Sequence, residues 1–149
     1  MSEPLNVLIV EDEALLAMEL ESLIEDSGHR VVGWATSSRE AMELLETTKA
    51  DIALVDMNLA DGLTGPDVAE YIDAKTSAMV VFLTANPKRA AENFAGAIGV
   101  IAKPYTMNGL LAALRYLEEG VRRPPPKTTL PAGFTLSPDY TRNWASTAS

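Results

Sequence analysis

Chemically reactive side chains follow four short apolar runs of this chain. They are Glu11 and Asp12 after residues 5–10, Asp56 after residues 52–55, Thr84 after residues 80–83 and Lys103 after residues 100–102. If the runs are neighbouring parallel strands, these side chains meet at the carboxyl edge of one sheet, where open α/β sheets bind their ligands. Three carboxylates, a hydroxyl and an ammonium group in one cleft suit a divalent cation and an acyl phosphate.

The residues between the runs predict the elements that position these side chains. After the first run, Leu16, Leu20 and Leu23 recur at helical spacing, and Gly28 is a typical helix stop. Later in the chain, Ser37 or Ser38 can cap the next helix. Five predicted strands alternate in this way with five predicted helices. We therefore expect an α/β fold with a doubly wound, five-stranded parallel sheet and helices on both faces.

The composition is that of an ordinary folded chain. It has 149 residues, 47% of them hydrophobic, and no cysteine. No apolar stretch approaches the roughly 20 residues of a membrane span, and the first residues lack the pattern of a secretory signal. The absence of cysteine excludes disulfides and thiolate metal sites and fits a cytoplasmic protein. We expect a soluble, cytoplasmic protein with no membrane contact.

The charge is unevenly divided along the chain. Residues 1–120 carry 8 Lys+Arg against 20 Asp+Glu, whereas residues 121–149 carry 4 against 1. An acidic body repels nucleic-acid phosphates. We therefore expect no direct contact with DNA.

The composition changes abruptly after Gly120. Five of the nine prolines lie in residues 121–149, and Pro-rich tails are commonly disordered linkers. This tail nevertheless carries large apolar side chains that need a surface to pack on, namely Leu130, Phe134, Leu136, Tyr140 and Trp144. We expect an ordered arm that docks on its own domain or reaches a partner subunit.

The residues at the strand ends resemble a known family. Glu11-Asp12, Asp56, Thr84 and Lys103-Pro104 are similar to the set found in the receiver domains of two-component response regulators. The resemblance covers about residues 4–120. It implies a receiver domain at 1–120 and a Pro-rich extension at 121–149, together a stand-alone response regulator.

The resemblance implies a role for each acidic residue. Asp56 would be the phosphoacceptor, attacking the phosphorus of a phosphohistidine on a sensor histidine kinase. Asp12, Asp56 and the backbone carbonyl of Asn58 would bind Mg²⁺ directly. Glu11 would hold a metal-bound water.

The remaining strand ends complete the implied pocket. Lys103 would pair with a phosphoryl oxygen, and the Thr84 hydroxyl would donate a hydrogen bond to the phosphoryl group. Many receivers have Tyr or Phe three residues before the lysine, where this chain has Val100. Rotation of an aromatic ring at that position therefore cannot be its switch.

Three functional classes fit these residues. The first is a phosphorylation-controlled switch that receives its phosphoryl group from a histidine kinase and acts through a target protein or a phosphorelay. The second is a phosphate-independent interaction module that works by constitutive dimerisation. The third is a hydrolase with an Asp nucleophile, but such phosphatases need an acid two residues on, where this chain has Asn58. We expect the first class, not an enzyme, and a homodimer whose contacts include the arm.

Overall fold

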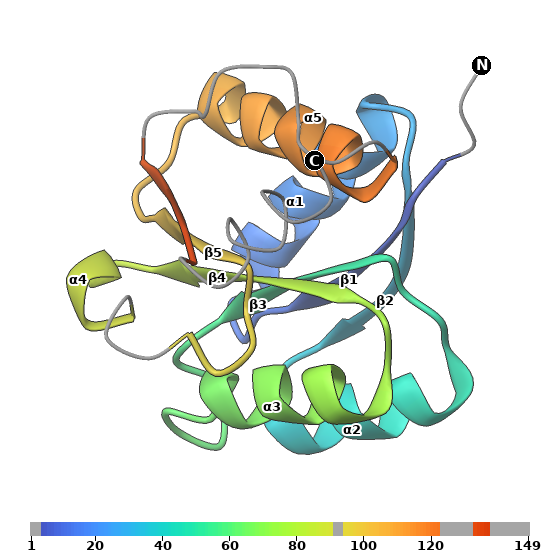
Figure 1. The fold of residues 1–149 in the computed structure, drawn as a ribbon, viewed down its shortest axis with the longest axis vertical. Helices are drawn as coiled ribbons and strands as arrows, with labels where there is room; N and C mark the ends of the chain where they lie inside the picture. The colour runs from blue at the N-terminus through green and yellow to red at the C-terminus, as the bar shows by residue number, and fades with distance from the viewer. Residues whose placement is uncertain (1–3, 91–93, 123–132, 138–149) are drawn as a thin grey trace, which may run out of the picture.

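Strands and helices alternate along the part of the chain that the structure, a computed structural model, describes: residues 4–90, 94–122 and 133–137 (Figure 1). The elements are β1 (Asn6–Val10), α1 (Ala14–Asp26), β2 (Arg30–Ala35), α2 (Ser38–Thr47), β3 (Ile52–Asp56), α3 (Gly65–Lys75), β4 (Met79–Thr84), α4 (Pro87–Ala90), β5 (Gly99–Ala102), α5 (Met107–Arg122) and β6 (Phe134–Leu136).

The strands form one sheet in the order β2-β1-β3-β4-β5-β6. Strands β1 to β5 pair in parallel, as the sequence predicts. The central strand β3 is buried along its whole length, which fits its uninterrupted apolar run. Because all five strands point the same way, their carboxyl ends lie at one edge.

Helices cover both faces of the sheet. Figure 1 shows α1 and α5 on one face and α2 and α3 on the other. Each face has its own apolar core, one with Leu20, Ile24 and Leu114 and the other with Val68 and Ile72. This confirms the doubly wound α/β architecture. Among the described residues, no helix is long and apolar enough to span a membrane.

The helix boundaries follow from local chemistry. The Ser37 side chain accepts a hydrogen bond from the Glu40 N–H and so caps α2. Gly28, which follows the C-cap residue Ser27 of α1, adopts φ +92°, a conformation that other residues rarely adopt. Both signals are present in the sequence. After β4 the structure describes one short helix, α4, and residues 91–93 that follow it lie outside the described part.

The sheet has a sixth strand that we did not predict from the sequence. Strand β6 pairs antiparallel with β5, with Phe134 opposite Ile101 and Leu136 opposite Gly99. Three residues are too few to show the alternation that identifies a strand. The extension thus contributes one strand to the domain of its own chain. The other apolar residues of the expected arm, Leu130, Tyr140 and Trp144, lie outside the described residues.

Candidate active site

The carboxyl edge of the sheet brings the predicted reactive residues together. Asp56 ends β3 and Thr84 ends β4, while Glu11 and Lys103 directly follow β1 and β5. The strand register aligns Val10 with Val55, and Thr84 with Ala102. Neighbouring parallel strands therefore end at nearly the same level, which is why residues far apart in the sequence share one cleft.

Lys103 links two of the acidic residues. Its Nζ atom lies 2.7 Å from Asp56 Oδ2 and 3.1 Å from Glu11 Oε1. The Glu11 side chain is 0% exposed, and that of Lys103 is 18% exposed. Buried charges are stable only when they are paired, and Lys103 offsets part of the charge of the two carboxylates. The peptide bond between Lys103 and Pro104 is cis.

One ammonium group does not balance the acidic residues around it. Burial, together with the neighbouring Asp56, raises the pKa of Glu11 to about 7, against the opposing effect of Lys103. Burial alone lowers the pKa of Lys103, but its hydrogen bonds to Asp56 and Glu11 outweigh that effect and raise the pKa above the usual value. The site therefore carries more negative charge than its own cation neutralises.

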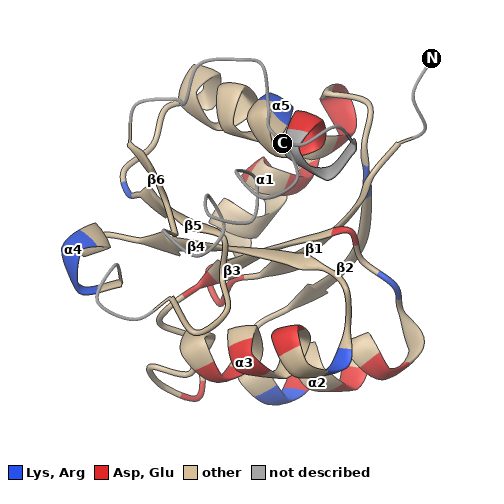
Figure 2. Ribbon diagram, viewed as in Figure 1, with Lys and Arg blue, Asp and Glu red and all other residues tan. Residues whose placement is uncertain are grey.

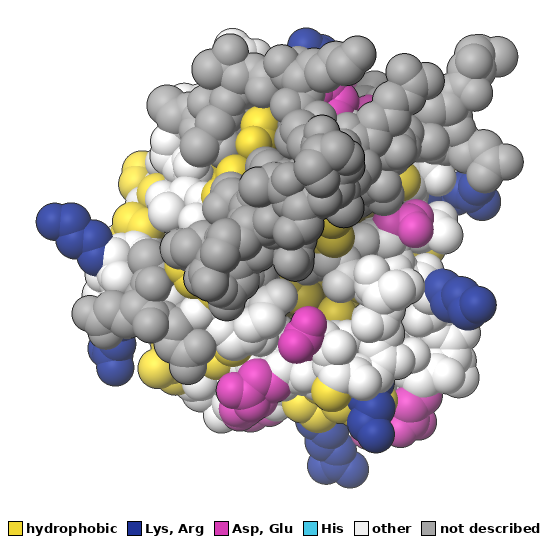
Figure 3. Space-filling view, viewed as in Figure 1, with side chains coloured by type: hydrophobic (Ala, Val, Ile, Leu, Met, Phe, Trp, Pro, Cys, Tyr) yellow, Lys and Arg dark blue, Asp and Glu magenta, His cyan; other side chains and the backbone are white. Residues whose placement is uncertain are grey.

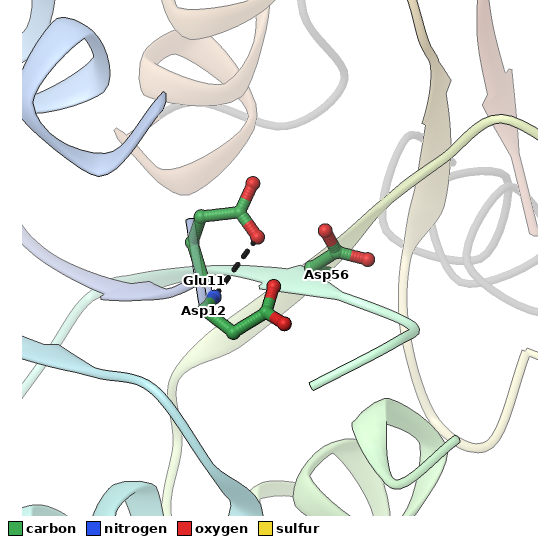
Figure 4. A group of neighbouring side chains, drawn as sticks. All are labelled: Glu11, Asp12 and Asp56. Carbon is green, nitrogen blue, oxygen red and sulfur yellow. Dashed lines mark hydrogen bonds between the residues drawn. The ribbon is translucent and has the colours of Figure 1, made fainter. Parts of the chain in front are cut away.

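Three carboxylates form a candidate metal site. Glu11, Asp12 and Asp56 each offer an oxygen, and these oxygens all lie within 4.8 Å of one another. Figure 4 shows the three side chains close together at the ends of two strands. Mg²⁺ is typically held by one or two carboxylates and keeps several of its waters, so these residues would fit that ion.

The match to a family of known proteins decides the identification. Residues 7–115 match the family described as response regulator receiver domain. The chain belongs to this family. Receiver domains are signalling modules of two-component systems that bind Mg²⁺ in the active site.

Individual receiver proteins show the same relationship. The transcriptional regulatory protein PdtaR of Mycobacterium tuberculosis is 36% identical over 116 residues, which cover 74% of this chain and 55% of PdtaR. The receiver domain of Erythrobacter litoralis PhyR has a TM-score of 0.71 at 29% identity, covering 85% of this chain and 98% of that domain.

A third structure is informative about the metal. The receiver domain of the Pseudomonas aeruginosa sensor kinase PA1611 holds a magnesium ion in its active-site cleft. Its TM-score is 0.66 at 25% identity, and the match covers 75% of this chain and 95% of that domain. The chain itself spans about half the length of the curated relatives PdtaR and PhyR.

Two tight turns shape the receiver's site beside Asp56 and Thr84. The Asn58 N–H donates to Asp56 Oδ1 at 2.9 Å, and the Asn86 N–H donates to Thr84 Oγ1 at 3.0 Å. In both turns, the side-chain oxygen of the last strand residue accepts a hydrogen bond from the main-chain N–H two residues later. A pocket of about 150 Å³ lies between them and is also lined by Arg89. Arg89 belongs to the basic helix α4, which Figure 2 shows apart from the acidic helices α2 and α3.

One contact to the acidic pair Glu11 and Asp12 was not predicted from the sequence. The indole Nε1–H of Trp34 donates to the main-chain carbonyl of Glu11 at 2.7 Å. No sequence signal could have shown this hydrogen bond, because it depends on the register between β1 and β2.

Proposed function

We propose that this chain is a stand-alone response regulator that accepts a phosphoryl group from a sensor histidine kinase onto Asp56, with Mg²⁺ as cofactor. The observation that carries the proposal is the setting of the Asp56 carboxylate. It has the Lys103 ammonium group at 2.7 Å and two further carboxylate oxygens within 4.8 Å. A nucleophile between a cation and a metal site suits phosphoryl transfer, which depends on positioning and charge stabilisation.

The proposed reaction transfers the phosphoryl group between two proteins. An Asp56 oxygen attacks the phosphorus of the kinase phosphohistidine, so that an O–P bond forms while the N–P bond breaks. The electron pair of the broken bond stays on the imidazole nitrogen of the kinase. Mg²⁺, when bound, neutralises charge on the phosphoryl oxygens.

Each neighbouring residue has a part in this proposal. Asp12, Asp56 and the Asn58 backbone carbonyl hold the ion, and Glu11 holds one of its waters. Lys103 already contacts Asp56 and turns its ammonium group to a transferred phosphoryl oxygen. The Thr84 hydroxyl, at the end of the adjacent strand, donates a hydrogen bond to the same group.

Intact mass measurement tests this proposal. The protein is incubated with Mg²⁺ and either acetyl phosphate or phosphoramidate. We expect one phosphoryl adduct, none with Asp56→Asn, and none when Mg²⁺ is removed by a chelator. An adduct that persists in Asp56→Asn would place the acceptor elsewhere. No adduct from either donor on folded protein would favour the phosphate-independent interaction module.

An apolar groove beside Lys103 supports a protein phosphodonor. The groove, of about 590 Å³, is lined by Leu16, Lys103 and Met107 among others. The same helix, α1, also carries Leu15 and Met18, which lie three residues apart on one side of it and are 71% and 63% exposed. Clustered exposed apolar side chains are typical of a protein contact surface. We propose that the kinase docks here, next to the acceptor carboxylate.

A charged substitution on this surface separates docking from chemistry. Because Leu15 is exposed, Leu15→Glu should leave the fold and the adduct from acetyl phosphate unchanged. Transfer from autophosphorylated kinases of the same organism should become at least about 10-fold slower, since a charge would have to be buried at the contact. Equal transfer rates in parent and variant would exclude this surface.

The output of the switch is proposed to be a protein contact or a phosphorelay. The net charge of −9 disfavours DNA, and Figure 3 shows the described Lys and Arg side chains standing apart on this face instead of forming a patch. We place the protein in the cytoplasm. We also propose a homodimer that involves residues 121–149, supported by the ordered strand β6 at the end of the described sheet.

A further inference from the structure

The peptide unit between Glu11 and Asp12 is held at both of its polar groups. Its N–H, from Asp12, donates to Glu11 Oε2 at 3.0 Å. Its carbonyl oxygen, from Glu11, accepts the indole N–H of Trp34 at 2.7 Å. Because this peptide joins two residues of the carboxylate cluster, its orientation determines the direction in which both side chains leave the main chain.

Strand β2 holds Glu11 from two positions. The Glu11 N–H donates to the Ala35 carbonyl at 2.9 Å, and the preceding residue, Trp34, supplies the indole. Both backbone groups of Glu11 thus have partners on β2. The main-chain contact extends the sheet, whereas the indole contact requires this particular side chain.

The exposure of Trp34 indicates that it does more than fill space. It is 40% exposed on β2, which is the outermost strand on its side of the sheet. The indole has a single polar atom, which can only donate, and that atom is directed at the site. A tryptophan that only packed against an exposed strand would not need its indole N–H to point at the site.

We propose that Trp34 is a positioning residue of the Mg²⁺ site. Its indole N–H fixes the Glu11 carbonyl and, through the shared peptide, the carboxylates of Glu11 and Asp12. This inference rests on the proposed function, because it concerns the same metal site. Groups that orient metal ligands typically change metal affinity 10- to 100-fold when they are removed. The indole is also placed to report on the ion, since Mg²⁺ would alter the field around its hydrogen bond.

Two tryptophan variants test this inference. Trp34→Phe keeps an aromatic ring and removes the donor, and Trp144→Phe is the matched control at the only other tryptophan of the chain. The dissociation constant of Mg²⁺ is obtained from the rise of the unfolding temperature with Mg²⁺ concentration. We expect it to be about 10-fold higher in Trp34→Phe than in the parent, and unchanged in Trp144→Phe.

Two further readouts separate positioning from a purely structural role. In Trp144→Phe, Trp34 is the only tryptophan. Its fluorescence emission should change over the same range of Mg²⁺ concentrations that raises the unfolding temperature. Saturating Mg²⁺ should restore phosphorylation of Trp34→Phe by acetyl phosphate to within about twofold of the parent.

The possible failures are distinguishable. If the parent binds Mg²⁺ and Trp34→Phe binds it equally tightly, Trp34 has no positioning role and the proposed function stands. If Trp34→Phe loses stability without Mg²⁺ while its Mg²⁺ affinity is unchanged, Trp34 is structural only. If neither protein responds to Mg²⁺, the metal site of the proposed function is itself wrong.

Discussion

Replacing Gly65 with alanine is expected to destabilise the protein by about 3 kcal/mol. Gly65 is the first residue of α3 and lies directly against the end of β3. An added Cβ would be 2.4 Å from the Asp56 carbonyl oxygen and 2.6 Å from Met57 Cα. Both are main-chain atoms, so neither can rotate out of the way. Either the helix or the end of the strand must move, and the strand end carries the proposed phosphoacceptor.

Thermal and urea unfolding measure this effect. A loss of about 3 kcal/mol corresponds to a fall of about 10 °C in the unfolding temperature. Gly109→Ala in α5 is the matched control, because its Cβ would meet only the Thr106 hydroxyl, at 3.0 Å. Alanine favours a helix over glycine by about 1 kcal/mol, so this variant should be as stable as the parent or more so. A Gly65→Ala variant within 1 kcal/mol of the parent would refute the backbone conflict.

The same variant should be a slow phosphoacceptor even where it stays folded. The Asp56 carbonyl belongs to the residue whose carboxylate would attack phosphorus, and a displacement of about 1 Å can cost about 100-fold in rate. We expect Gly109→Ala to form the adduct at the parental rate. Stability and phosphorylation are therefore linked through one contact between a helix start and a strand end.

Much of this architecture could be predicted from the sequence because it depends on local patterns. Apolar runs, helical spacing, the Ser37 cap and the Gly28 stop are each readable within a few residues, and the alternation of elements then predicts the parallel sheet. The reactive residues could be grouped for the same reason. If strands are parallel, the residues after them share an edge, whatever their separation in the sequence.

The unpredicted features all depend on contacts between distant residues. Trp34 reaches the Glu11 carbonyl only because of the register between two strands. Strand β6 is too short to show a periodicity, and it exists because β5 offers it an edge. The close contact of Gly65 likewise depends on how closely the start of α3 packs against the end of β3. Sequence patterns indicate which elements form, but not which side chains meet between them.

Phe134→Ala is expected to cost about 3 kcal/mol and to detach β6 from the sheet. The Phe134 side chain lies in the core with only 5% of its surface exposed. Its ring meets that of Tyr116 edge to face, with centroids 5.8 Å apart. It also covers Gly99 so closely that a Cβ there would lie 2.4 Å from the ring. The backbone contacts of a three-residue strand are too few to replace this burial.

Urea unfolding and amide hydrogen exchange measure the loss. The Ala102 N–H donates to the Gly133 carbonyl at 2.9 Å, so its protection should fall in Phe134→Ala if β6 detaches. Thr135→Ala is the matched control, because Thr135 lies in the same strand with its side chain exposed. Its stability should stay within about 0.5 kcal/mol of the parent. Equal stability and equal Ala102 protection in the two variants would show that Phe134 does not anchor the strand.

The position of β6 connects the extension to the proposed switch. The N–H of Ala102 donates to the carbonyl of Gly133, the residue just before β6, and Ala102 directly precedes Lys103. The strand that pairs with β6 therefore ends directly before the lysine that is proposed to contact the phosphoryl group. Light scattering on the parent and on Phe134→Ala also tests the proposed homodimer. A dimeric parent and a monomeric variant are expected, whereas equal, monomeric masses would exclude a dimer through the extension and leave the role of β6 within its own domain intact.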